Sequence, residues 1–160
     1  MSLLKKSCVI TFSGAGNTGK STALMELIKF FIKENQLKNK QEYKIFMYNS
    51  KKKAFEIISN LPKRKDCRVF IELTDGRKCG INTQGDPSTG VGWWLETFKN
   101  EGCDIFITAT RTPSSATYKD AESFTKKYGY PFISIKATKK DTNTYFTNIS
   151  LAEFLFGLIK

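Results

Sequence analysis

The chain has 160 residues, 40% of them hydrophobic and 13% aromatic, a composition that fits one packed domain over residues 1–160 and excludes a disordered chain. No apolar run is long enough to cross a bilayer and no secretory leader is recognised, so we expect a cytoplasmic protein without a membrane partner. The net charge of +11 comes from lysines in short, scattered groups, which leaves a solvated surface and a nucleic-acid partner as alternatives.

Two common kinds of site are not expected from these side chains. The sequence has no histidine, and its four cysteines, at positions 8, 67, 79 and 103, include no C-x-x-C pair. We therefore predict neither a zinc site nor histidine-based acid–base catalysis. Each cysteine stands at the start of a predicted strand, which favours four reduced, buried thiols.

The first predicted elements are a strand and a helix joined by a glycine-rich turn. The apolar run CVITF begins at position 8, and apolar residues at helical spacing follow from about position 19 to 34. Between them the residues GAGNTGKS, from position 14 to 21, fit the spacing G-x-x-x-x-G-K-[ST]. Glycines let backbone N–H groups come close to a polyanion, and the helix start adds unpaired N–H groups and the positive end of its dipole.

This stretch resembles the phosphate-binding loop, or Walker A motif, of the P-loop NTPase superfamily, on its kinase and GTPase-like side. Lys20 would place a charge near the β- and γ-phosphates, and Ser21 would offer its hydroxyl oxygen to Mg²⁺. The resemblance implies that nine residues bind nucleotide: Gly14, Ala15, Gly16, Asn17, Thr18, Gly19, Lys20, Ser21 and Thr22.

The middle of the chain predicts a strand, a helix and a hairpin. The run KIFMY at 44–48 indicates a strand, and Ser50 is a suitable cap for a helix that ends before Pro62. Two strand-like runs, 68–73 and 78–83, flank an Asp-Gly dipeptide at 75–76, which is a strong hairpin signal.

The remaining segments continue the alternation of helices and strands. Ser150 and Glu153 form a capping box for a last helix, after an irregular stretch at 138–148. Because strands alternate with helices, we predict an α/β fold: a three-layer, mostly parallel sheet with helices on both faces and one antiparallel hairpin strand. The other elements expected here are a helix over 89–101, a strand over 104–108, a helix over 117–128 and a strand over 131–135.

Asp86 is the carboxylate that topology favours for the site. In an open α/β sheet, ligands bind beyond the carboxyl ends of the strands. Asp86 follows the second arm of the hairpin, whereas Asp75 and Asp104 lie at the opposite end of the sheet. We therefore expect Ser21 and Asp86 to hold Mg²⁺. The arrangement resembles that of the small GTPases, but the sequence here is DPST, so the Asp-x-x-Gly spacing of their switch is absent.

Arg111 is the third predicted catalytic residue, beside Lys20 and Asp86. It follows the strand at 104–108, where a guanidinium can point toward the γ-phosphate or an acceptor phosphate. The alternative is an arginine that pairs with a surface carboxylate. Hydroxyls at positions 110, 112, 114 and 115 offer hydrogen bonds to a substrate, although many ordinary loops are equally rich in hydroxyls.

Two signals bear on the nucleotide base. The residues TKKD at 138–141 fit the [NT]-K-x-D pattern of GTPases, but no later strand–helix pair supplies the companion loop. Trp93 or Trp94 is a candidate for stacking on a base, with Trp94 on the apolar face of its helix and so better suited to core packing. We expect ATP as the nucleotide and keep GTP as the alternative.

Together these features predict a small enzyme that binds a magnesium–nucleoside triphosphate complex and transfers the γ-phosphoryl group to a small-molecule acceptor or to water. One alternative is a nucleotide-dependent switch or partner-binding module with slow hydrolysis, which the hairpin edge and the TKKD motif favour. Another is an ATPase that acts on nucleic acid, which only the charge suggests. No side chain stands out as a general base; Asp86 could serve, but it would then hold two roles.

Overall fold

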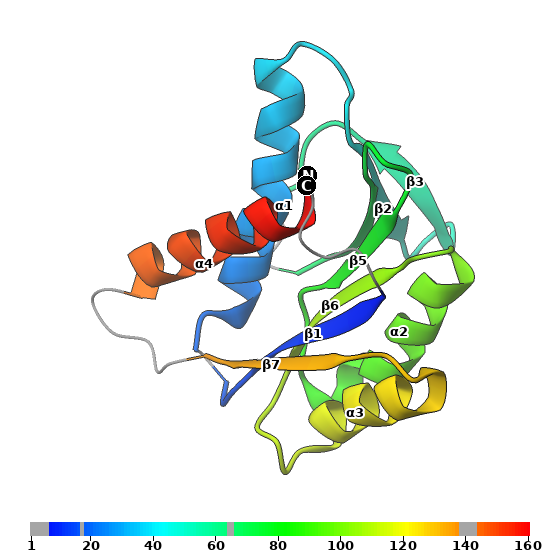
Figure 1. Cartoon of the computed structure of the whole chain (residues 1–160), viewed down its shortest axis with the longest axis vertical. Coiled ribbons are helices and arrows are strands. Elements are labelled where there is room, and N and C mark those ends of the chain that lie inside the picture. The colour runs from blue at the N-terminus through cyan, green and yellow to red at the C-terminus, as the bar shows by residue number, and fades with distance from the viewer. Residues whose placement is uncertain (1–6, 17, 64–65, 138–143) are drawn as a thin grey trace.

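The computed structural model describes residues 7–16, 18–63, 66–137 and 144–160, and in these ranges seven strands form one sheet with the order β3-β2-β4-β5-β6-β1-β7 (Figure 1). The strands are β1 (Cys8–Ser13), β2 (Lys44–Asn49), β3 (Ala54–Ile58), β4 (Arg68–Glu72), β5 (Lys78–Asn82), β6 (Ile105–Thr110) and β7 (Phe132–Lys136). The helices are α1 (Lys20–Leu37), α2 (Val91–Asn100), α3 (Ala116–Tyr128) and α4 (Thr144–Ile159), with a short 3₁₀ helix, η1, at Pro87–Thr89.

The sheet is mixed, with a parallel half and an antiparallel half. β1 pairs in parallel with β6 and β7, and β5 pairs in parallel with β6. β2 pairs antiparallel with β3 and β4, and β4 pairs antiparallel with β5. The α/β class is as predicted, but three of the six pairs are antiparallel, so the expected mostly parallel sheet with a single hairpin strand is not what the structure has.

The difference comes from the segment 50–61, for which the prediction of a helix was wrong. This segment turns back and pairs with β2 as strand β3. The Asn49 side-chain oxygen accepts hydrogen bonds from the N–H groups of Lys51 and Lys52 at 3.0 and 3.3 Å, and Lys53 has a φ of 51°. An asparagine side chain that binds nearby N–H groups stabilises a turn at the expense of a helix. The chain therefore forms a hairpin where apolar spacing alone suggested a helix.

Helices cover both faces of the sheet, as predicted (Figure 1). On one face α1 and α4 meet at Phe31 and Phe156, whose ring centroids lie 4.8 Å apart. On the other face Phe98 of α2 and Phe124 of α3 are buried in a second apolar cluster, and the Phe124 ring lies 5.1 Å from that of Phe106 in β6. The core thus consists of two apolar layers, one on each side of the sheet.

The last helix begins earlier than predicted. α4 starts at Thr144, so residues 144–148, which were expected to be irregular, are helical. Ser150 and Glu153 lie inside this helix and do not form the predicted capping box at its start. Further along, Leu155 and Phe156 are buried in the cluster that α4 shares with α1. Packing of this apolar surface extends the helix beyond the start that the local cap signal indicated.

The four cysteines are free and buried, as predicted. Burial raises the pKa of the Cys8, Cys79 and Cys103 thiols, which keeps them in the protonated, unreactive form. Among the helices in the described part of the chain, none combines the length and the apolar character that crossing a membrane requires.

Candidate functional site

The loop between β1 and α1 wraps around the end of the Lys20 side chain. Lys20 Nζ donates hydrogen bonds to the carbonyl oxygens of Gly14 and Ala15, at 2.6 and 2.8 Å. Thr18 Oγ1 donates to the Ala15 carbonyl oxygen at 2.9 Å. Gly19 precedes the helix with a φ of 81°, a left-handed conformation that favours glycine, and it has no side chain to cap the first-turn N–H groups. The loop and the helix start thus offer one ammonium and unpaired N–H groups to an anion.

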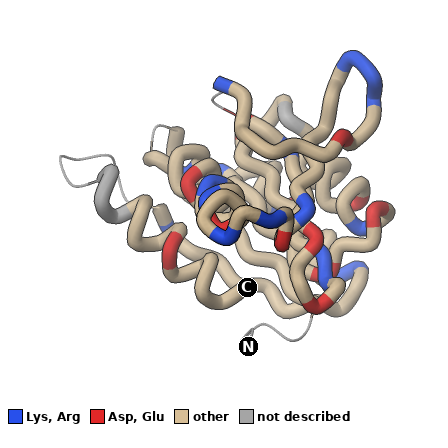
Figure 2. The backbone as a smooth tube through the Cα atoms, turned by 90° about the horizontal axis from the view of Figure 1, so that it is seen from above, with Lys and Arg blue, Asp and Glu red and all other residues tan. Residues whose placement is uncertain are grey.

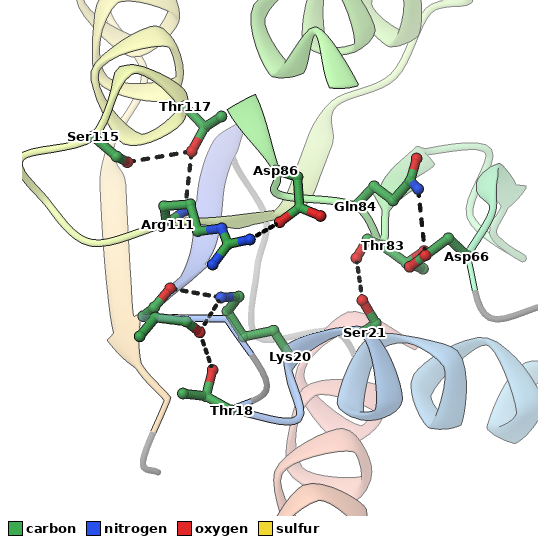
Figure 3. A network of polar contacts seen from close by, with 12 residues as sticks. Thr18, Lys20, Ser21, Asp66, Thr83, Gln84, Asp86, Arg111, Ser115 and Thr117 are labelled. Atoms are coloured by element: carbon green, nitrogen blue, oxygen red, sulfur yellow. Dashed lines mark hydrogen bonds and ion pairs between the residues drawn. The ribbon is translucent and has the colours of Figure 1, made fainter. Parts of the chain in front are cut away.

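Two cations face the same space in this loop. Lys20 is 9% exposed, and its pKa is lowered mainly by burial and further by the charge of Arg111, while Asp86 acts in the opposite direction. In Figure 3 the Lys20 ammonium and the Arg111 guanidinium lie on the same side of the loop. Because like charges raise each other's energy, an anion placed beside both would be bound by both.

The structure brings Asp86 and Arg111 into direct contact. Asp86 follows β5 and Arg111 follows β6, and these neighbouring strands are parallel, so both residues lie at the carboxyl edge of the sheet. The Arg111 guanidinium forms an ion pair with Asp86. The Arg111 backbone N–H donates to Thr117 Oγ1 at 3.0 Å, which links this loop to the first turn of α3. Of the two alternatives for Arg111, the pairing with a carboxylate is present, while its role at a phosphate stays a prediction.

Two glycines permit this close arrangement. A Cβ atom at Gly16 would clash with the Arg111 guanidinium, so that side chain lies directly against the loop. A Cβ atom at Gly85 would lie 2.6 Å from the Ala109 carbonyl carbon and 2.7 Å from the Thr110 nitrogen, closer than real Cβ contacts. The residue before Asp86 must therefore be glycine for the end of β5 to pack on the end of β6 in this way.

Ser21 and the residues after β5 form the other side of the site. Ser21 Oγ donates a hydrogen bond to the Thr83 carbonyl oxygen at 2.8 Å. Thr83 Oγ1 and Gln84 Nε2 lie 3.3 Å from the two carboxylate oxygens of Asp66 (Figure 3). Asp66 was missed from the sequence because it precedes a strand. That strand, β4, runs antiparallel to β5, with Arg68 opposite Asn82, so its start lies at the carboxyl edge.

The loop before α1, the first turns of α1 and the residues after β5 and β6 line one cleft of about 810 Å³, a volume typical of small-molecule sites. Asn17, predicted to bind nucleotide, lies outside the described residues. Gly14 and Ala15 contribute the carbonyl groups that Lys20 binds. The loop and helix residues on the cleft wall are Gly16, Thr18, Gly19, Lys20, Ser21, Thr22, Met25, Glu26 and Lys29; the remaining lining residues are Leu61, Pro62, Lys63, Asp66, Gln84, Gly85, Asp86 and Arg111.

The predicted metal ligands fit the preferences of Mg²⁺. Ser21 and Asp86 line the same cleft and supply a hydroxyl and a carboxylate oxygen. Among the described residues, no group of three or more Asp, Glu, Cys or His side chains gathers at one point. Mg²⁺ bound with a nucleotide uses one or two carboxylates together with phosphate oxygens and water, so this sparse donor set is suitable.

Several other predicted candidates do not reach the cleft. Asp75 pairs with Arg77 in the β4–β5 turn, and Asp104 accepts a hydrogen bond from the Lys78 N–H, both at the edge of the sheet away from the loop. The TKKD motif at 138–141 lies outside the described residues.

Two of the hydroxyls at 110–115 and one of the two tryptophans contribute to the fold. Thr110 is buried and its hydroxyl lies 2.7 Å from that of Thr11, and Ser115 caps α3. Trp94 is buried against Tyr48, while Trp93 is 59% exposed and lies edge-on to Trp94. Neither tryptophan lines the cleft, so the hypothesis of base stacking finds no support there.

The positive charge is distributed over the molecule. In Figure 2 the Lys and Arg segments lie at separate places along the chain, with acidic segments between them. Several lysines pair with glutamates on the same element or a neighbouring one, as Lys52 does with Glu56 and Lys127 with Glu96. This distribution favours a solvated surface over one continuous nucleic-acid face.

Comparison with known proteins gives no match: no protein-family model, no curated protein and no solved structure is significantly similar to this chain.

Proposed function

We propose that the chain binds Mg²⁺ together with a nucleoside triphosphate, ATP in the first instance, and transfers the γ-phosphoryl group to a small-molecule acceptor or to water. The observation that carries this proposal is the convergence of the G-x-x-x-x-G-K-S loop, Asp86 and Arg111 on one cleft. These groups come from the ends of β1, β5 and β6, so three separate sequence signals meet at one edge of the sheet.

The hydrogen bonds of Lys20 within the loop support a phosphate site. The Lys20 ammonium is bonded to two neutral carbonyl oxygens. A phosphate oxygen is a charged acceptor, and charge-assisted hydrogen bonds are about twice as strong as neutral ones. The N–H groups of the loop and of the first turn of α1 would complete the anion site. A triphosphate would therefore bind along residues 14–22, with Lys20 at its β- and γ-phosphates.

The proposed chemistry relies on positioning and electrostatics. Ser21 and Asp86 would hold Mg²⁺. When bound, this ion would neutralise charge on the phosphate oxygens. Arg111 faces the loop and would stabilise the charge that develops on the transferred group, a contribution of about 10³–10⁵-fold in rate for arginines in this role.

Thermal unfolding tests the binding step. The melting temperature would be measured with Mg²⁺ and ATP, GTP, ADP or GDP in turn. At about 100 times the Kd, binding stabilises the folded state by about 2.7 kcal/mol, or about 5–10 °C for a domain of this size. We expect Lys20→Ala to lose this response and Lys33→Ala, an exposed position on the same helix, to keep it. A folded wild-type protein that responds to no triphosphate would refute the proposal.

A nucleotide-dependent switch would share this binding step and differ in turnover. Steady-state release of the nucleoside diphosphate, measured with and without candidate acceptors, separates the two functions. An enzyme is expected to show acceptor-dependent turnover, whereas a switch remains in one nucleotide state for many minutes.

A further inference from the structure

The cleft continues past the phosphate-binding loop toward Asp66. Beyond Ser21 its lining includes the apolar side chains of Met25, Leu61 and Pro62, together with the charged residues Glu26, Lys29 and Lys63. Asp66 lines the same part of the cleft. A ligand seated here would have apolar contacts on its walls and a carboxylate beside it, outside the residues that bind the triphosphate.

Asp66 is held in position by a chain of contacts. Its two oxygens lie 3.3 Å from Thr83 Oγ1 and Gln84 Nε2. Gln84 Oε1 in turn accepts a hydrogen bond from the Arg68 guanidinium, which lies 4.8 Å above the Trp94 ring. A carboxylate has about four lone-pair sites, and the contacts to Thr83 and Gln84 use one on each oxygen. These contacts orient the Asp66 side chain.

The three carboxylates of the cleft, Glu26, Asp66 and Asp86, have different surroundings. Glu26 is engaged in an ion pair with Lys29, and Asp86 in one with Arg111. None of the ion pairs between described residues involves Asp66. Thr83 connects Asp66 to the metal-binding hydroxyl, because its carbonyl oxygen accepts the Ser21 hydrogen bond while its side chain contacts Asp66 (Figure 3). Asp66 and Asp86 line the same cleft, and Asp86 is already engaged by Arg111, so Asp66 suits a base better than Asp86 does.

Building on the proposed function, we propose that Asp66 is the general base for a hydroxyl-bearing acceptor, and that this acceptor is a small alcohol with an apolar face, the class to which nucleosides belong. The acceptor oxygen forms a bond to the γ-phosphorus while the bond from that phosphorus to the β,γ-bridging oxygen breaks. The nucleoside diphosphate leaves with the electron pair of the broken bond. The hydroxyl proton passes to Asp66 and then to solvent. The apolar face of the acceptor packs on Met25, Leu61 and Pro62.

The test compares Asp66→Asn with Asp120→Asn, which removes the same charge from an exposed position on α3. The probes are the common ribonucleosides and deoxyribonucleosides with Mg²⁺ and ATP or GTP, and the readouts are phosphorylated product, diphosphate release, nucleotide Kd and the Mg²⁺ requirement. We expect a nucleoside to accelerate diphosphate release by the wild-type protein. Asp66→Asn should lower transfer by at least about 100-fold, the usual contribution of a general base, while the nucleotide Kd changes by less than about twofold.

Three outcomes would overturn the inference while leaving nucleotide binding intact. If Asp66→Asn raises the Mg²⁺ requirement, Asp66 acts at the metal; if it leaves transfer unchanged, the base lies elsewhere. If no nucleoside accelerates turnover, the acceptor class is wrong. A wild-type protein that binds no triphosphate would instead refute the proposed function, and this inference with it. Thermal unfolding of both variants, which should melt close to the wild type, separates these results from misfolding.

Discussion

Replacement of Asp86 by asparagine separates its proposed role as a metal ligand from its observed role as the partner of Arg111. The Asp86 side chain is 57% exposed, and an ion pair this exposed contributes at most about 1 kcal/mol to stability. The melting temperature should therefore fall by no more than about 4 °C. Any larger effect on nucleotide binding would have to arise in the site rather than from loss of the fold.

The effect on affinity should have opposite signs with and without Mg²⁺. Without the metal, Asp86→Asn removes a negative charge beside the phosphates and releases Arg111. A unit charge at about 4 Å is worth about 1 kcal/mol in water, so the affinity for the triphosphate should rise by about fivefold. With Mg²⁺, the variant lacks a carboxylate ligand, and the gain in affinity that the metal provides should shrink by about tenfold or more.

Equilibrium titration with a fluorescent triphosphate, at fixed ionic strength with Mg²⁺ or with EDTA, measures both effects. Asp75→Asn is the matched control, because Asp75 is 50% exposed and also pairs with an arginine, but lies at the other edge of the sheet. It should leave both affinities unchanged. If Asp86→Asn weakens binding equally with and without Mg²⁺, Asp86 is not a metal ligand and the reasoning fails.

Two further substitutions test the contacts at the ends of β5 and β6. Arg111→Ala should reduce single-turnover phosphoryl transfer by about 10³-fold with little change in nucleotide Kd; an equal rate in the variant would assign Arg111 to the Asp86 ion pair alone. Gly85→Ala forces a Cβ atom against backbone and should destabilise the fold by about 1–3 kcal/mol, or about 3–10 °C. Gly157→Ala is the control, because a Cβ atom there meets nothing within 4 Å, and it should melt at or above the wild-type temperature. If the Gly85→Ala and Gly157→Ala variants lose similar stability, the close approach at Gly85 is not needed.

The parts of the fold that could be predicted are those set by short-range signals. The order of strand, glycine turn and helix around residues 8–37 follows from an apolar run, a motif and a helical spacing that all agree. The Asp-Gly turn at 75–76 also formed as expected, with Gly76 at a φ of 87°. The segment 50–61 was different, because its apolar residues fit a short helix and a strand equally well. The Asn49 side chain, through its hydrogen bonds to the following N–H groups, determines which of them forms.

The positions of Asp86 and Arg111 could be predicted because both follow parallel strands, and the carboxyl ends of parallel strands meet at one edge. Their ion pair could not be predicted, since it requires β5 and β6 to be neighbours in the sheet. The side chains at 110–115 illustrate the converse: their composition suggested a substrate loop, but Thr110 and Ser115 are used by the sheet and by the cap of α3.

Asp66 shows how a correctly predicted hairpin carries information about the site. In a parallel sheet a residue that precedes a strand lies at the amino edge, far from a ligand. The first arm of an antiparallel hairpin begins beside the end of its second arm, so the register that places Arg68 opposite Asn82 also brings Asp66 next to Thr83 and Gln84. The antiparallel half of this mixed sheet therefore adds a carboxylate to the cleft that the parallel half forms. If Asp66 proves to be the base, the hairpin is part of the catalytic architecture, and its register should tolerate no shift by a single residue.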